Sequence, residues 1–266
     1  MTARRLGWRP DPPGHPGTPT KRFAARSGAI ALRGSLASLV VDVRDQGQLG
    51  SCVAVSGVQA LRMREIAQGV PTASVVLGSA LYGYFYGRAE DGMASLAYDA
   101  GTTHASFFQG MSEYGLAPES IWPYSDLDTG AGSDPFRRFP PAEAVRLGFD
   151  QRAVVAQAID DPDPRVRLDA VRSAISELRP VLLGCDVDKA FETGDFDPTK
   201  PLDPPTVSAG GHAMIVEAYD GDIFTILNSW GEDFGTNGRI LFSSAYLATC
   251  ALRLVERTPI IEGEAT

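Results

Sequence analysis

Four polar side chains in this sequence have the chemistry needed to attack a carbonyl group, although they lie far apart along the chain. Cys52 closes the stretch Gln46-Gly47-Gln48-Leu49-Gly50-Ser51-Cys52, and His212 and Asn228 follow in the second half. A thiol becomes a strong nucleophile when an imidazole takes its proton, and the imidazole works best when a hydrogen-bonding residue fixes its orientation. These residue types therefore indicate nucleophilic catalysis by a cysteine.

Cys52 lies at the start of a predicted helix. Ser51 can serve as the N-cap, and an apolar face continues until Gly69 and Pro71 end the helix. The unpaired N–H groups of a first helical turn favour a thiolate, so this position predicts a lowered thiol pKa. The alternative is a structural cysteine, because cysteine is among the residues most often buried.

His212 and Asn228 lie in two predicted strands that form a hairpin. Strand side chains alternate between faces, so these two residues share a face only if the loop holds an odd number of residues. A three-residue loop, 219–221, brings His212 opposite Asn228 at hydrogen-bonding distance. Each residue alone has a structural alternative: His212 as a core histidine and Asn228 as a strand-end cap.

Helical patterns dominate the first half of the chain and strand patterns the second, which predicts the α+β class. Helices are predicted from residue 51 and over 74–88, 103–114 and 165–178, and strands over 180–187, 212–218, 222–228 and 239–242. Three regions follow. Residues 1–38 are an extended, poorly packed, Pro-rich segment, 39–130 a helical lobe carrying Cys52, and 131–266 a β-rich lobe carrying His212 and Asn228.

Composition excludes several classes of protein. The net charge of −9 over 266 residues argues against nucleic acid or an anionic membrane as a partner. Three cysteines (Cys52, Cys185 and Cys250) do not make a disulfide framework, and no apolar stretch is long enough to span a membrane. No secretory signal is recognisable, so a cytoplasmic location is expected, with export by a signal-independent route left open.

Three blocks of this sequence resemble the papain-like cysteine peptidase family (C1-type). The blocks are Gln46-Gly47-x-x-Gly50-Ser51-Cys52, Gly211-His212-Ala213 and Asn228-Ser229-Trp230-Gly231-x-x-Phe234-Gly235-x-x-Gly238, and they occur in the order of the family. The opening Gly7-Trp8-Arg9-Pro10-Asp11 is similar to prokaryotic members with a short N-terminal segment.

The resemblance implies a two-lobed fold with the active-site cleft between a helical lobe and an antiparallel β-rich lobe. It implies Cys52 as nucleophile, His212 as acid and base, and Asn228 as the residue that orients the imidazole. The side-chain amide of Gln46 and the backbone N–H of Cys52 would form the oxyanion hole. The implied reaction is hydrolysis of peptide bonds through an acyl-thioester, on a peptide or protein substrate and without a metal or organic cofactor.

The resemblance also implies residues that contact substrate, for which the candidates are Gly101, Gly211 and Trp230. Trp230 resembles the indole that shields the contact between His212 and Asn228 from water. Val53 follows the nucleophile where the family usually has an aromatic residue, so less cover over the cleft wall is expected. His104, close to Gly101, is expected to be a surface or groove residue.

Other outcomes stay open at this point. If an amine attacks the thioester in place of water, the protein is a transpeptidase or another acyltransferase. If the site is catalytically inactive, the protein is a module that only binds peptides. Residues 1–38 could lie along the helical lobe or across the cleft as an autoinhibitory segment, or form a flexible arm packed on the β lobe. The oligomeric state is not indicated.

Overall fold

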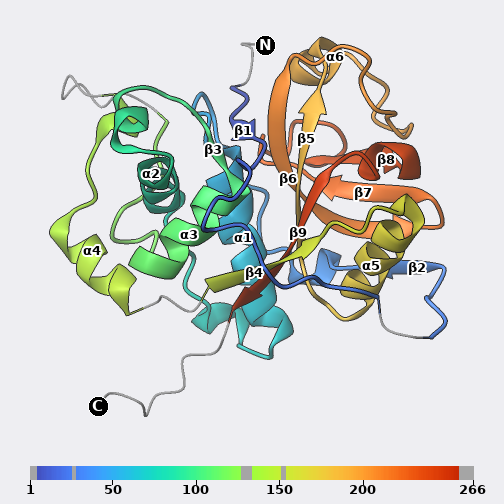
Figure 1. Cartoon of the computed structure of the whole chain (residues 1–266), viewed down its shortest axis with the longest axis horizontal. Helices are drawn as coiled ribbons and strands as arrows, with labels where there is room; N and C mark the ends of the chain where they lie inside the picture. The colour runs from blue at the N-terminus through green and yellow to red at the C-terminus, as the bar shows by residue number, and fades with distance from the viewer. Residues whose placement is uncertain (1–4, 26–27, 127–133, 151–153, 258–266) are drawn as a thin grey trace.

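The computed structural model describes residues 5–25, 28–126, 134–150 and 154–257. The first half carries the helices α1 (Cys52–Ala67), α2 (Ala80–Glu90) and α3 (His104–Tyr114). Figure 1 shows α2 and α3 on one side of the molecule and a large sheet on the other, with α1 between them. The predicted α+β class is confirmed.

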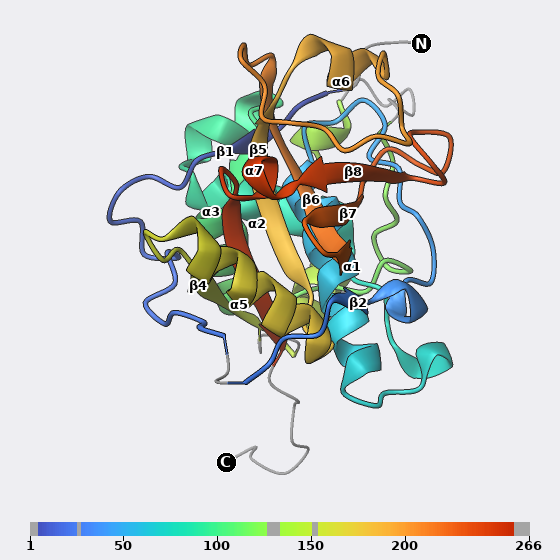
Figure 2. The ribbon, with the colours of Figure 1, turned by 90° about the vertical axis from the view of Figure 1, so that its right-hand side faces the viewer.

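The second half builds an antiparallel sheet whose central strands are β5 (Val181–Val187) and β6 (Gly210–Asp220). The strand order is β4-β9-β5-β6-β7-β8, and a short N-terminal strand, β2, also pairs with β6. The remaining strands are β2 (Arg33–Ser35), β4 (Val154–Ile159), β7 (Ile223–Leu227), β8 (Arg239–Ser243) and β9 (Ala251–Arg257). Figure 2 shows α5 (Pro164–Ser176) packed across this sheet.

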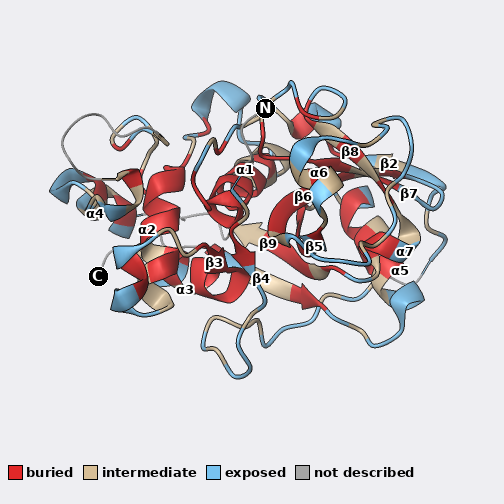
Figure 3. Ribbon diagram, turned by 90° about the horizontal axis from the view of Figure 1, so that it is seen from above, coloured by how far each residue is buried: buried red, intermediate tan, exposed pale blue. Residues whose placement is uncertain are grey.

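Helix α1 is buried along most of its length, which explains why its apolar residues are not confined to one face. Residues 52–61 are all buried, as Figure 3 shows for the centre of the molecule. A helix that is apolar on all sides belongs inside a core. The hydroxyl of Ser56 donates to the backbone oxygen of Ala213 at 3.1 Å, which ties the first turns of α1 to β6. The start of α1 is therefore held against the strand that carries His212.

The predicted elements differ from the structure at several places. Helix α2 begins at Ala80 rather than near 74, because the Ser79 hydroxyl caps it by accepting the Tyr82 N–H at 3.2 Å. Sequence reasoning did not identify α4 (Ala142–Phe149), β4 or β9. The predicted boundary at residues 130–131 lies outside the described residues.

Most of the described residues of the N-terminal segment are exposed or half-buried, but Gly7, Trp8 and Leu36 are buried, so the segment is well packed at these places. Trp8 and Arg9 form strand β1, which pairs in parallel with β3 (Thr102–Thr103). The backbone N–H of Phe23 donates to Ala158 of β4 at 2.8 Å. Among the described residues, no helix is long and apolar enough to cross a membrane.

Candidate active site

His212 and Asn228 are hydrogen-bonded to each other in the buried interior. Nε2 of His212 lies 2.7 Å from Oδ1 of Asn228, and Oδ1 also accepts the backbone N–H of Ser229 at 2.8 Å. Because a backbone N–H can only donate, this Asn228 atom is the oxygen and Nε2 of His212 must carry the proton. In the neutral ring the unprotonated nitrogen is then Nδ1, which is buried and has no hydrogen-bond partner among the described residues.

The hairpin that brings these residues together differs from the predicted one. Its loop holds two residues, 221–222, instead of three at 219–221. A two-residue loop alone would place His212 and Asn228 on opposite faces of the hairpin. A β-bulge at Glu217 supplies the missing residue by shifting the register of β6 against β7. The predicted proximity is correct, but the bulge and not the loop produces it.

The thiol of Cys52 lies against the start of β6. Burial raises the pKa of this thiol to about 12, against the opposing effect of the nearby backbone N–H groups of Ala213, Gly7 and Val53. Burial likewise lowers the pKa of His212 to about 4, against the opposing effect of its bond to Asn228. The expected low thiol pKa is therefore wrong for this state, in which both groups are neutral.

Gln46 is held so that its amide nitrogen faces the N-terminal segment. Its Oε1 accepts the Ser229 hydroxyl at 2.7 Å and the Trp230 indole N–H at 3.1 Å. Its Nε2 donates to Leu49 O at 2.7 Å and to Arg5 O at 3.0 Å. The two donors at Oε1 fix which end of the amide is nitrogen, so Gln46 presents an N–H to a carbonyl oxygen.

Residues 5–9, here called the strap, cross this site. Arg5 gives its carbonyl to Gln46, and Gly7 donates its N–H to Gly211 O at 3.1 Å and accepts the Thr102 N–H at 2.8 Å. In Figure 1 the strap is the blue stretch that descends through the middle of the molecule, beside β3. The N-terminal segment has features of more than one sequence-based alternative, because residues 5–9 lie across the site while Phe23 is bonded to Ala158 of β4 in the sheet.

Two of the three substrate-contact candidates touch the strap backbone. A Cβ on Gly101, whose φ is +68°, would lie 2.0 Å from the Gly7 oxygen, and one on Gly211 would lie 2.2 Å from the Trp8 oxygen. Both sites thus admit a peptide chain at close range because they lack a side chain. Trp230 is fully buried, and its ring centroid lies 4.4 Å from that of His212. It packs against His212 and donates its indole N–H to Gln46.

Two further expectations need correction. Ser51 occupies the N-cap position, but its hydroxyl makes no cap and instead lies 2.6 Å from the Tyr124 hydroxyl. Val53, the residue after the nucleophile, is completely buried in the core. His104 is not at the surface, because it too is completely buried, with its ring 6.0 Å from that of Trp8.

Sequence reasoning gave no role to several residues that shape the site. The Ser229 hydroxyl donates to Gln46 and orients it. The position of Ser229 between Asn228 and Trp230 was the feature of the sequence that indicated a place at the site. Asp99 accepts the Gly50 N–H at 3.1 Å and the Tyr84 hydroxyl, which joins the loop before Cys52 to the segment before Gly101. No local pattern marks that link, because its members lie far apart in the sequence.

The two buried histidines predict a loss of stability in acid. Burial lowers the pKa of His104 to about 3, with the Asp11 carboxylate acting in the opposite direction, and that of His212 to about 4. The unfolded chain takes up these protons below its own pKa of about 6.5, before the folded chain does, so stability is lost as pH falls. Each histidine should lower the free energy of unfolding by about 3 kcal/mol between pH 7 and pH 4.

Urea unfolding of the parent chain and a His104→Gln variant at the two pH values checks this expectation. The variant should show a smaller difference between pH 7 and pH 4, by about 3 kcal/mol. An equal difference in both chains would mean that His104 titrates normally in the folded state.

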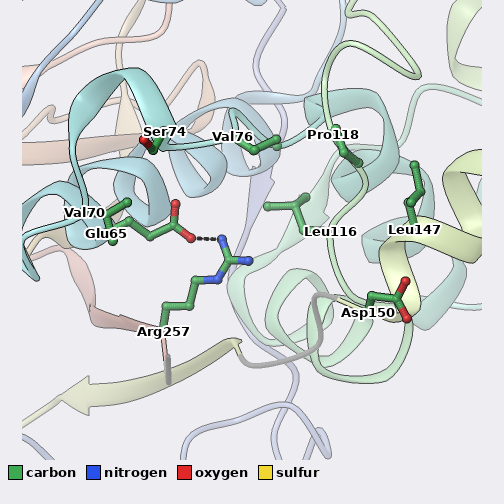
Figure 4. Close-up of a pocket in the computed structure, with 10 residues that line it drawn as sticks. Glu65, Val70, Ser74, Val76, Leu116, Pro118, Leu147, Asp150 and Arg257 are labelled. Carbon is green, nitrogen blue, oxygen red and sulfur yellow. Dashed lines mark ion pairs between the residues drawn. The ribbon is translucent and has the colours of Figure 1, made fainter. Parts of the chain in front are cut away.

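A separate hollow lies away from these residues (Figure 4). It has a volume of about 290 Å³ and is lined by Val70, Val76, Leu116 and the ion pair between Glu65 and Arg257. Glu65 is in the last turn of α1, roughly 20 Å along the helix from Cys52. The hollow therefore does not belong to the site around the thiol.

Comparison with known proteins gives a consistent result. The family described as papain family cysteine protease matches residues 30–259. An uncharacterised peptidase C1-like protein of Acanthamoeba polyphaga mimivirus is 27% identical over 212 residues, which cover 77% of this chain and 65% of that protein. The chain thus spans somewhat less than two-thirds of that relative.

Solved structures show the same fold. Xylellain, a cysteine protease from Xylella fastidiosa, superimposes with a TM-score of 0.77 at 21% identity, over 97% of this chain and 99% of that one. Procathepsin B from Trypanosoma congolense gives a TM-score of 0.68 at 13% identity, over 97% and 87% of the two chains. The predicted two-lobed fold is confirmed by these similarities.

Proposed function

Because the chain belongs to the papain family of cysteine proteases, we propose that it hydrolyses peptide bonds with Cys52, His212 and Asn228 through an acyl-thioester. The observation that carries the proposal is the bond from His212 Nε2 to Asn228 Oδ1, since it leaves Nδ1 as the nitrogen able to accept a proton. The thiol of Cys52 lies at the same end of β6, near the backbone N–H of Ala213.

The first half-reaction begins when a substrate takes the place of the strap. Nδ1 of His212 takes the proton of Cys52, and the sulfur attacks the scissile carbonyl carbon. The carbonyl oxygen becomes an oxyanion, and the Gln46 amide that now holds Arg5 O donates to it, together with the backbone N–H of Cys52. The intermediate then expels the amine, which receives its proton from His212, and leaves an acyl-thioester on Cys52.

Water completes the reaction by the same steps. Nδ1 of His212 removes a proton from the water as its oxygen attacks the thioester carbon. The carbon–sulfur bond breaks, the carboxylic acid leaves, and the proton on His212 returns to the Cys52 sulfur. Asn228 keeps its bond to Nε2 throughout, so that the ring does not turn away.

Labelling by an electrophilic peptide tests this assignment. A peptidyl epoxide should alkylate Cys52 in stoichiometric amount, as read by mass spectrometry of the digested protein, and should leave Cys185 and Cys250 unlabelled. In a Trp8→Ala chain, whose strap is released, alkylation of Cys52 no faster than that of free cysteine in the same buffer would contradict a catalytic site. Products from a peptide ester with an added amine show whether water or the amine resolves the thioester.

A further inference from the structure

Two of the three cysteines occupy opposed positions on neighbouring strands. The antiparallel register of β5 and β9 ends at the pair Gly184 and Ala251, so the next residues along the two chains are Cys185 and Cys250. Directly opposed residues of an antiparallel pair have Cα atoms about 4.5–5.5 Å apart, and a disulfide needs a Cα separation of about 4.4–6.8 Å. The register therefore places these cysteines where a disulfide can join them with little movement of the backbone.

The two thiols are also neighbours in the interior. Both are free, and only 3% of Cys185 and 5% of Cys250 are exposed. Burial raises the pKa of Cys250, and the nearby Cys185 thiol raises it further. The Cys250 thiol donates to Tyr246 O in α7 (Ser244–Leu247) at 3.4 Å, and the Tyr246 hydroxyl donates to Asp186 O at 2.6 Å. These bonds hold the turn before β9 against the end of β5.

We propose that Cys185 and Cys250 form an oxidation site, at which hydrogen peroxide joins them in a disulfide that ties β5 to the start of β9. The inference does not depend on the peptidase function. Cys250 reacts first, because it lies in a turn and is the more exposed of the two. Its sulfur attacks one oxygen of the peroxide, the O–O bond breaks, and a sulfenic acid and one water form. The Cys185 sulfur then attacks the Cys250 sulfur, the S–O bond breaks, and a second water leaves with the Cys185 proton.

Cys52 is the competing partner for Cys185, and the sheet keeps the two apart. A Cβ on Gly184 would meet the ring of Trp8, so Gly184 faces the strap. Successive residues of a strand face opposite sides, and Cys185 therefore points to the other side of β5. Of the groups that shift the pKa of Cys52, burial acts most, and the Cys185 thiol acts less than the nearby backbone N–H groups. A disulfide between Cys52 and Cys185 is not expected.

The disulfide should stabilise the folded chain. It would close a loop from residue 185 to residue 250, which contains β6, β7 and β8. A crosslink across a loop of this length strongly restricts the unfolded chain. The midpoint temperature of thermal unfolding should therefore rise by about 5 °C or more on oxidation, and reduction by dithiothreitol should reverse the rise.

Peptide mapping of the oxidised full-length chain tests the proposal. The parent is treated with hydrogen peroxide, digested without reduction and analysed by mass spectrometry. We expect one crosslinked species that joins the peptides of Cys185 and Cys250 and lacks two hydrogen atoms. A Cys52→Ala chain keeps the pair and should form the same crosslink. A Cys185→Ala chain should form none, and its midpoint temperature should not rise on oxidation.

Three results would overturn the assignment. The first is a crosslink between Cys52 and Cys185, and the second is a sulfinic or sulfonic acid on Cys250 beside a free Cys185 thiol. The third is a parent chain in which both thiols stay free under peroxide that converts free cysteine completely to cystine. A crosslinked chain that unfolds at the same temperature as the reduced one would contradict the stabilising effect. The map of the parent chain is decisive even if Cys185→Ala does not fold, and Cys250→Ala then replaces it as the control.

Discussion

Replacing Cys52 by alanine should lower kcat/KM for peptide hydrolysis by a factor on the order of 10⁴ to 10⁶, and His212→Ala should cost about as much. Neither variant can complete the first half-reaction, because one lacks the sulfur and the other lacks the nitrogen that takes its proton. Groups that act as a unit are strongly non-additive, so the double variant should be no slower than either single variant.

The measurement compares initial rates on one fluorogenic peptide for the parent and the three variants. Cys250→Ala is the matched control, because it removes a buried thiol that bonds to Tyr246 O and takes no part in the proposed reaction. It should keep the parent rate within about threefold. A Cys52→Ala chain that retains the parent rate would show that the activity has another nucleophile. Double-variant losses that multiply would show that His212 acts independently of Cys52.

Short motifs were sufficient to predict that His212 and Asn228 lie together, but they gave no role to Ser229 or Asp99. Cys52 is the first residue of a helix whose apolar side chains must be buried. His212 lies near the start of β6 and Asn228 directly after β7, at the open end of one hairpin. The hairpin loop was predicted incorrectly, because either a three-residue loop or a bulge places His212 and Asn228 on the same face of the sheet. A bulge at Glu217 depends on packing around β6 that no local pattern records.

The strap could not be placed from the sequence for a different reason. Its backbone is bonded to residues 102–103, to Gly211 and to the Gln46 side chain, all of which are far away in the chain. A Pro-rich segment disfavours helix and sheet without indicating what it packs against. The thiol pKa was then predicted in the wrong direction, because burial of Cys52 between the strap and the start of β6 outweighs the helix terminus.

The strap also predicts a gain of function. A full-length Trp8→Ala chain should hydrolyse peptides faster than the parent, by at least about tenfold and up to roughly 10³-fold. Loss of a buried tryptophan typically costs about 3–5 kcal/mol, and here that cost falls only on the state in which the strap is bound. The equilibrium therefore shifts toward chains whose Gln46 amide and Cys52 thiol are available to a substrate, and the gain stops once such chains predominate.

Alkylation of Cys52 by iodoacetamide gives a second readout that needs no substrate. Burial holds the thiol neutral in the strapped state, so entry of water after release of the strap should lower its pKa and speed the reaction in Trp8→Ala. Val207→Ala, which removes an equally apolar but exposed side chain, is the control and should leave both rates unchanged. If Trp8→Ala is slower than the parent in both measurements, the strap is a support that holds the site together and does not block it.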